Sequence, residues 1–214
     1  MTNFIPIFPL SIVVYPGESL NLHIFEPRYK QLINECWAEA KPFGIPSVIN
    51  NEVQEYGTLV KVVEIVTVHD NGEIDIKTQG TDVFRILEII KSVPDKLYSG
   101  AIVNYPENFL STGYTELMKK VVNAIRELHK LLKINKDFIK PDDELTAYDI
   151  AHHAGLSLDE EYDLLKLMRE EQRQEYLKRH FSRVLPVIAQ METLKERVKL
   201  NGHFKNLSSF QFED

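Results

Sequence analysis

The chain has 214 residues, of which 43% are hydrophobic and 27% are charged, and its formal net charge is −7 at pH 7. This composition is ordinary for a globular protein and provides enough apolar residues for one large domain or two small ones. The acidic balance argues against broad nucleic-acid binding, because that binding depends on Lys and Arg neutralising phosphates.

The first 40 residues predict a turn, a strand and a helix in that order. Tyr15-Pro16-Gly17-Glu18 predicts a turn, because proline presets φ at one corner and glycine allows a positive φ at the next. Apolar and polar residues alternate from Leu20 to Ile24, which indicates a half-buried strand. Glu26-Pro27 ends this strand, and a proline at the first helical position predicts a helix from Arg28 to Ala40.

A β-rich pattern continues to about Pro106. Strands are predicted over residues 43–48, 57–68, 74–87 and 98–105. Asn71-Gly72 stands between two of these strands and predicts a hairpin with a type I′ turn, in which both central residues need positive φ. In the return strand we expect Ile74 and Ile76 to point inward, and Gly80 to mark a bend or bulge. Short strands separated by turns are typical of a small closed or nearly closed barrel.

From Ser111 onward the pattern is helical. Apolar residues recur at helical spacing from Tyr114 to Leu132. Thr146 with Asp149, and Ser157 with Glu160, match the reciprocal capping box and predict the starts of two short helices. A long last helix is predicted from Glu171 to Lys199, and Pro186 should kink or break it.

Several runs of the sequence, taken together, resemble one known family. They are Phe8-Pro9-Leu10, Phe25-Glu26-Pro27-Arg28-Tyr29, Gly57-Thr58, the hairpin over 70–73, Gly80 with Phe84-Arg85-Ile86, and residues 145–156. They resemble the Lon substrate-binding domain, the amino-terminal module of Lon-type ATP-dependent proteases. The run from His23 to Tyr29 is more similar to the free-standing bacterial members of that family than to the full-length proteases.

The resemblance implies an α+β fold in three parts. Residues 1–110 would form a PUA-like β pseudobarrel with one inserted helix. Residues 111–200 would form a helical bundle that ends in a long helix, and residues 201–214 would form a C-terminal tail. For function, the resemblance implies a non-catalytic module that binds unfolded or exposed apolar protein segments, or a partner protein.

The sequence contains no recognisable catalytic motif. No glycine is followed by a Gly-Lys pair at the spacing of a phosphate-binding loop. We therefore expect no enzymatic activity, no cofactor and no bound metal. Two alternatives stay open. One is a PUA-like nucleic-acid-binding protein, an argument from fold alone that the acidic charge opposes. The other is a small enzyme with a site built from His23, Glu26 and Arg28.

The candidate peptide-binding residues are four aromatic side chains near the start of the chain. They are Phe25, Tyr29, Trp37 and Phe43. Buried, they would belong to the core of the barrel and helix; exposed, they would form an apolar patch able to hold an unfolded segment. Glu26, Pro27 and Arg28 are interpreted as a structural corner, in which Arg28 pairs with a carboxylate or caps carbonyls.

The remaining reactive residue types favour structural roles. Cys36 lies on the apolar face of its predicted helix, where a buried thiol is expected rather than a nucleophile. Adjacent helical residues such as His152 and His153 point about 100° apart, so they do not readily share a metal ion. A single cysteine excludes an internal disulfide, and no signal peptide or membrane-spanning stretch is apparent, so we expect a cytoplasmic protein.

Overall fold

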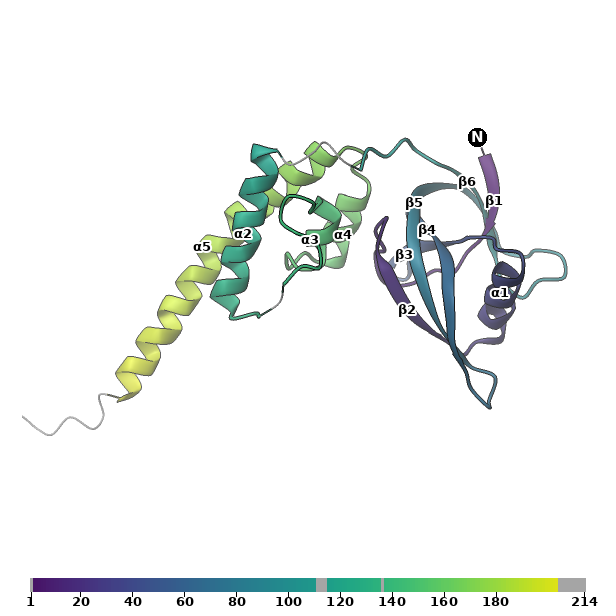
Figure 1. Ribbon diagram of the computed structural model, residues 1–214, viewed down its shortest axis with the longest axis horizontal. Coiled ribbons are helices and arrows are strands. Elements are labelled where there is room, and N and C mark those ends of the chain that lie inside the picture. The colour runs from purple at the N-terminus through teal and green to yellow at the C-terminus, as the bar shows by residue number, and fades with distance from the viewer. Residues whose placement is uncertain (1, 111–114, 136, 204–214) are drawn as a thin grey trace, which may run out of the picture.

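The computed structural model describes residues 2–110, 115–135 and 137–203 (Figure 1). In chain order its elements are β1 (Thr2–Pro6), β2 (Ser19–Ile24), α1 (Pro27–Ala38), β3 (Phe43–Ile49), β4 (Glu52–Val68), β5 (Ile74–Ile90), β6 (Gly100–Asn104), α2 (Glu116–Leu132), α3 (Ala147–Ala151), α4 (Leu158–Leu165) and α5 (Glu170–His203). The predicted α+β class is confirmed. An antiparallel sheet with one inserted helix precedes a group of helices that ends in a long one.

The sheet is built around two long neighbouring strands, β4 and β5. The strand order is β1-β6-β5-β4-β3, and β2 pairs with β5 beyond the part that pairs with β6. Parallel bridges join Ile7 to Gly44 and Leu10 to Ser47, so the segment after β1 reaches β3 at the other edge of the sheet. The sheet therefore curls back on itself, as the predicted barrel requires.

Gly80 lies where β5 bends, as predicted. The register of β4 with β5 shifts between Leu59 and Val60, opposite Gly80. Gly80 also exchanges backbone hydrogen bonds with the predicted turn: Gly17 N donates to Gly80 O, and Gly80 N donates to Glu18 O. A Cβ at Gly80 would lie 2.4 Å from the carbonyl oxygen of Tyr15, so only glycine lets the two backbones approach this closely.

The predicted type I′ turn at Asn71-Gly72 is wrong. Of these two residues only Gly72 has a positive φ, 75°. Gly72 N donates to His69 O and His69 N donates to Glu73 O, which gives a longer loop that ends with a left-handed glycine. The β3–β4 connection instead places two consecutive residues at positive φ, Asn50 (51°) and Asn51 (64°), because asparagine tolerates this region.

The inserted helix α1 begins at Pro27, as the helix-start pattern predicts, and ends two residues earlier than expected. Its buried residues are Tyr29, Leu32, Ile33 and Cys36. They pack against the inner face of the sheet, where Ile74 and Ile76 point inward as predicted. This packing fixes the position of α1 and of the residues that lead into it.

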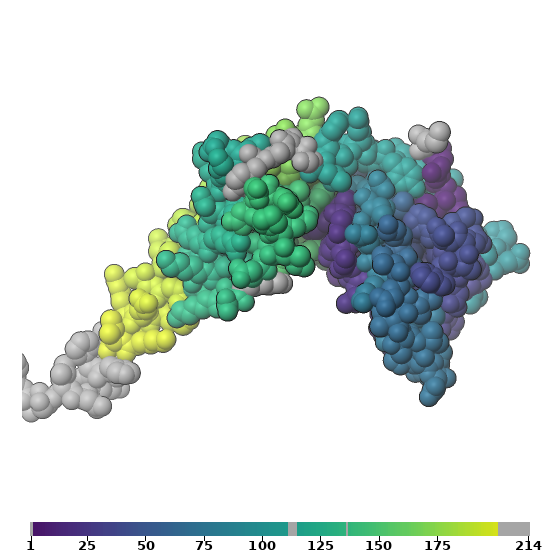
Figure 2. All heavy atoms as spheres, viewed as in Figure 1, coloured from purple at the N-terminus to yellow at the C-terminus, as the bar shows by residue number. Residues whose placement is uncertain are grey.

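Both predicted capping boxes form in the helical half. Thr146 caps α3 with Asp149, and Ser157 caps α4 with Glu160. Helix α5 continues through Pro186, so of the two predicted effects the break does not occur, and the kink stays a prediction. The end of α5 projects past α2 as an arm (Figures 1 and 2). Residues 201–203, predicted as part of the tail, extend α5. The rest of the predicted tail, 204–214, lies outside the described residues, as does Tyr114 at the start of the predicted helical pattern.

None of the helices in the described ranges combines the length and the hydropathy needed to cross a lipid bilayer.

One hydrophobic core joins the two halves of the chain. Val13, Tyr15, Ile49 and Val83 from the β-rich half pack with residues of all four C-terminal helices. The hydroxyl of Tyr15 also donates to the carbonyl oxygen of Glu161 at 3.0 Å. Because the core crosses residue 110, the division into subdomains at that residue stays a prediction.

His152 forms a charged link across this junction. Its Nε2 lies 3.1 Å from Oε2 of Glu18, and its Nδ1 lies 2.8 Å from Oε1 of Glu161. Its ring also packs on Tyr15, with 4.8 Å between ring centroids. Partial burial alone would lower the pKa of His152, but the two carboxylates outweigh it and raise the pKa to about 9.

We expect His152→Gln to destabilise the fold in a pH-dependent way. Because the folded pKa lies above the unfolded value of 6.5, protonated His152 stabilises the fold fully below about pH 6.5, and this contribution disappears as the pH rises through about 9. In urea unfolding, the substitution should lower the free energy of unfolding by about 1 kcal/mol at pH 6 and by almost nothing at pH 9.5. The value at pH 6 allows for the partial exposure of His152 to solvent. An equal loss at both pH values would contradict the charged link.

Candidate functional site

The four aromatic candidates divide into two buried and two exposed residues. Tyr29 stacks on Phe8 with 3.8 Å between ring centroids, and the ring centroid of Phe43 lies 6.4 Å from that of Phe8. Tyr29 and Phe43 are therefore core residues and not surface anchors, because they complete the packing between α1 and the sheet. Phe25 and Trp37 are exposed, at opposite ends of α1.

Glu26, Pro27 and Arg28 form the turn between β2 and α1. Pro27 is the first residue of the helix, and Glu26 occupies the N-cap position without a side-chain cap. Arg28 Nη2 donates to Oε2 of Glu26 at 2.6 Å, and its guanidinium lies over the Tyr29 ring. His23 bonds to other carboxylates, so His23, Glu26 and Arg28 do not converge on a common site.

A shallow groove lies on the outer face of β2, β5 and β4, near the β4–β5 hairpin. We call it the hairpin groove; it has a volume of about 330 Å³. Its lining residues are Asn21, Leu22, His23, Val66, Asp75, Ile76 and Lys77. The exposed ring of Phe25 stacks on His23, with 6.2 Å between centroids, and so extends the apolar surface of the groove.

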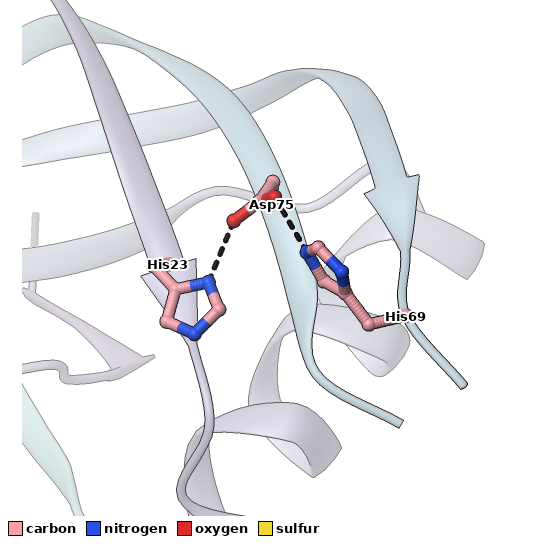
Figure 3. A group of neighbouring side chains, drawn as sticks. All are labelled: His23, His69 and Asp75. Carbon is pink, nitrogen blue, oxygen red and sulfur yellow. Dashed lines mark hydrogen bonds and ion pairs between the residues drawn. The ribbon is translucent and has the colours of Figure 1, made fainter. Parts of the chain in front are cut away.

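Two histidines and one carboxylate, His23, His69 and Asp75, form a cluster at the groove (Figure 3), and a second carboxylate, that of Glu73, adjoins His23. Nδ1 of His23 lies 2.7 Å from Oδ1 of Asp75, and Nε2 of His69 lies 2.7 Å from Oδ2 of the same carboxylate. Oε2 of Glu73 lies 3.0 Å from Nε2 of His23. The backbone brings these residues together, because His23 and Asp75 are cross-strand partners and His69 and Glu73 close the hairpin loop.

The contacts within this cluster shift the pKa values of its members. Hydrogen bonding to Asp75 raises the pKa of His23. The bonds from His23 and His69 lower the pKa of Asp75, and bonds to Asn71 and His23 lower the pKa of Glu73. The lowered pKa values of Asp75 and Glu73 keep both carboxylates negatively charged at neutral pH.

The sequence interpretation missed this cluster. Its members come from separate positions along the chain, and none of them belongs to a metal-binding or catalytic motif. One signal was present: His69 and Asp75 flank the predicted hairpin turn, so the hairpin itself brings them close. His23 meets Asp75 only because β2 pairs with β5, and the sequence pattern of β2 does not show which strand it pairs with.

Cys36 is buried in the barrel core, as expected for a structural thiol. Burial, together with the nearby carboxylates of Glu35 and Glu39, raises its pKa to about 12. A thiol with such a pKa holds its proton at neutral pH and is a poor nucleophile.

Comparison with known proteins identifies the family. The family model described as the ATP-dependent protease La (LON) substrate-binding domain matches residues 5–182. The chain belongs to the Lon substrate-binding domain family. The resemblance drawn from the sequence motifs is thereby confirmed.

Two solved structures of Lon N-terminal domains share this fold. A Lon N-terminal domain protein from Xanthomonas campestris has 23% sequence identity and a TM-score of 0.60, covering 82% of this chain and 96% of that one. The N-terminal domain of Lon protease from Mycobacterium avium complex has 15% identity and a TM-score of 0.63, covering 84% and 98%. At these identities the similarity is one of fold.

The residues matched to the family include the hairpin groove but not the end of α5. The hairpin groove and its cluster, residues 21–77, lie within the part of the chain matched to the Lon substrate-binding domain. The match ends at residue 182, inside α5, so the projecting end of that helix lies beyond it.

Proposed function

We propose that this chain is a non-catalytic recognition module that binds exposed apolar segments of other proteins. The observation that carries the proposal is the match of the Lon substrate-binding domain over most of the chain. A domain described by substrate binding supports a role in holding polypeptide, and it carries no description of chemistry of its own.

We assign the binding surface to the hairpin groove and Phe25. An exposed aromatic ring beside a groove is the kind of anchor that contributes most of the energy of a protein interface. Phe25 is held in place by the stack on His23 and by α1, which starts two residues later, so its ring loses little freedom on binding. Val66 adds apolar surface on the β4 side of the groove.

We expect Phe25→Ala to weaken binding of an unfolded chain about tenfold, the loss of one modest interface anchor. The probe is a reduced and alkylated model protein that cannot refold, labelled with a fluorophore. Its anisotropy is followed as the full chain is added.

The matched control is Leu194→Ala on the projecting end of α5. Leu194 is 62% exposed and Phe25 is 59% exposed, so both variants remove a comparably exposed apolar side chain. The control should bind like the unmodified chain. No saturable binding by the unmodified chain would contradict the proposed function, and equal losses in both variants would contradict the assignment to the groove.

Charge around the groove argues against the nucleic-acid alternative. The outer face carries the carboxylates of Glu64, Glu73 and Asp75, and the ammonium of Lys77 is already paired with Glu64 at 2.8 Å. Phosphates approaching this face would meet negative charge. A protein segment with apolar side chains is the better fit to this surface.

A further inference from the structure

We propose that His23, His69 and Asp75 bind a divalent transition-metal ion of the zinc class. The three residues offer two imidazole nitrogens and one carboxylate oxygen, and these ligand atoms lie within 4.8 Å of one another. Two histidines and one carboxylate are a ligand set that suits Zn²⁺, with a fourth position left for water or another ligand.

The backbone holds these residues close together before any ion binds. His23 and Asp75 are paired across β2 and β5, and Thr67, two residues before His69, is paired with Asp75 across β4 and β5. Two of the ligands therefore lie on paired strands of one sheet, and His69 directly follows the end of β4. A site arranged in this way requires little ordering of the chain on binding, which favours affinity.

Both imidazole rings turn a nitrogen toward the Asp75 carboxylate (Figure 3). Nδ1 of His23 and Nε2 of His69 both face the Asp75 carboxylate at 2.7 Å, one on each oxygen. The two imidazole rings are inclined at 71° and do not stack, so their nitrogens can aim at a common centre. Tetrahedral zinc with ligands at about 2.0–2.1 Å needs ligand atoms about 3.3 Å apart, and small rotations of these partly exposed side chains can close that difference.

Glu73 supplies the outer support that metal-binding histidines usually have. Its carboxylate accepts a hydrogen bond from Nε2 of His23 at 3.0 Å. A proton held at Nε2 leaves the Nδ1 lone pair free for the ion and fixes the orientation of the ring. Glu73 also adds a second negative charge beside the proposed cation.

The first test is zinc titration of the untagged full chain by isothermal calorimetry after removal of bound metal with a chelator. We expect one zinc ion per chain. The single substitutions His23→Gln, His69→Gln and Asp75→Asn should each weaken zinc binding by more than about tenfold. Glu73→Gln should weaken it by about tenfold. The matched control is His152→Gln, since His152 also contacts two carboxylates but belongs to no comparable group of three ligand side chains among the described residues; zinc affinity should not change.

A second test needs no substitution in the measured protein. In the NMR spectrum of the unmodified chain, zinc should shift the ring signals of two of the seven histidines, assigned as His23 and His69. Absence of saturable zinc binding would overturn the proposal, as would unchanged affinity in the ligand variants or shifts confined to other histidines. Neither test involves a peptide, so its failure would leave the proposed recognition of apolar segments untouched.

Discussion

Replacing Arg173 with methionine is expected to lower the free energy of unfolding by about 3–5 kcal/mol. Arg173 lies at the start of α5 and is fully buried, with 0% of its side chain exposed. Its Nε donates to Oε2 of Glu170 at 2.9 Å, and its guanidinium also donates to the carbonyl oxygens of Leu167 and Phe109, each at 2.6 Å. Methionine would leave all of these acceptors without the guanidinium donor.

The buried carboxylate of Glu170 makes this loss large. Apart from Arg173, it accepts from Ala147 N at 2.7 Å and from Nε2 of Gln174 at 3.2 Å, and neither donor carries a charge. An unneutralised carboxylate in the core is strongly destabilising, so adding Glu170→Gln to Arg173→Met should restore at least about 1 kcal/mol.

Urea unfolding measures these effects, and Arg179→Met is the matched control. Arg179 is on the same helix and pairs with Glu175 at 3.0 Å, but its side chain is 76% exposed. Exposed ion pairs contribute about 0–1 kcal/mol, so the control should cost little. Similar losses for Arg173→Met and Arg179→Met would contradict the role assigned to the buried network.

Gly57→Ala is expected to lower the free energy of unfolding by about 3 kcal/mol, at the upper end of the range for an overpacked core. Gly57 in β4 lies opposite Pro46 in β3. A Cβ at Gly57 would lie 2.4 Å from the carbonyl oxygen of Ile45 and 2.5 Å from Cα of Pro46. These are backbone atoms of a buried strand, so neither can move aside without breaking the pairing of β3 with β4.

The control for this prediction is Gly155→Ala. Gly155 has a φ of 73°, and a Cβ there would meet open space, so alanine brings only the cost of a left-handed backbone, about 1–2 kcal/mol. Thermal or urea unfolding of both variants separates close backbone approach from conformational preference. If Gly155→Ala were the more destabilising of the two, the steric explanation for Gly57 would be wrong.

Local patterns predicted most of the elements, because their causes lie within a few residues of one another. The capping boxes at Thr146 and Ser157 formed because each pairs residues three apart. The helix start at Pro27 and the bend at Gly80 follow from the backbone chemistry of a single residue. The turn type at Asn71-Gly72 was wrong, because Gly72 alone supplied the left-handed residue that this loop needed.

The proposed binding surface at Phe25 and the cluster at Asp75 depend on contacts between segments that are distant in the sequence. Nothing in the sequence separates Phe25 and Trp37, which are exposed, from Tyr29 and Phe43, which are buried. The cluster at Asp75 needed β2 to pair with β5 in a specific register, since a shift of one residue would turn His23 to the opposite face.

The sequence by itself determined the family, the class of fold and the positions of most helices and strands, since short-range backbone preferences and apolar periodicity specify them. Only the tertiary structure decided which aromatic rings reach solvent, that His152 links the two halves, and that His23 and His69 both contact Asp75. These features depend on strand order, register and packing between residues far apart in the chain, which are set by the closure of the sheet as a whole.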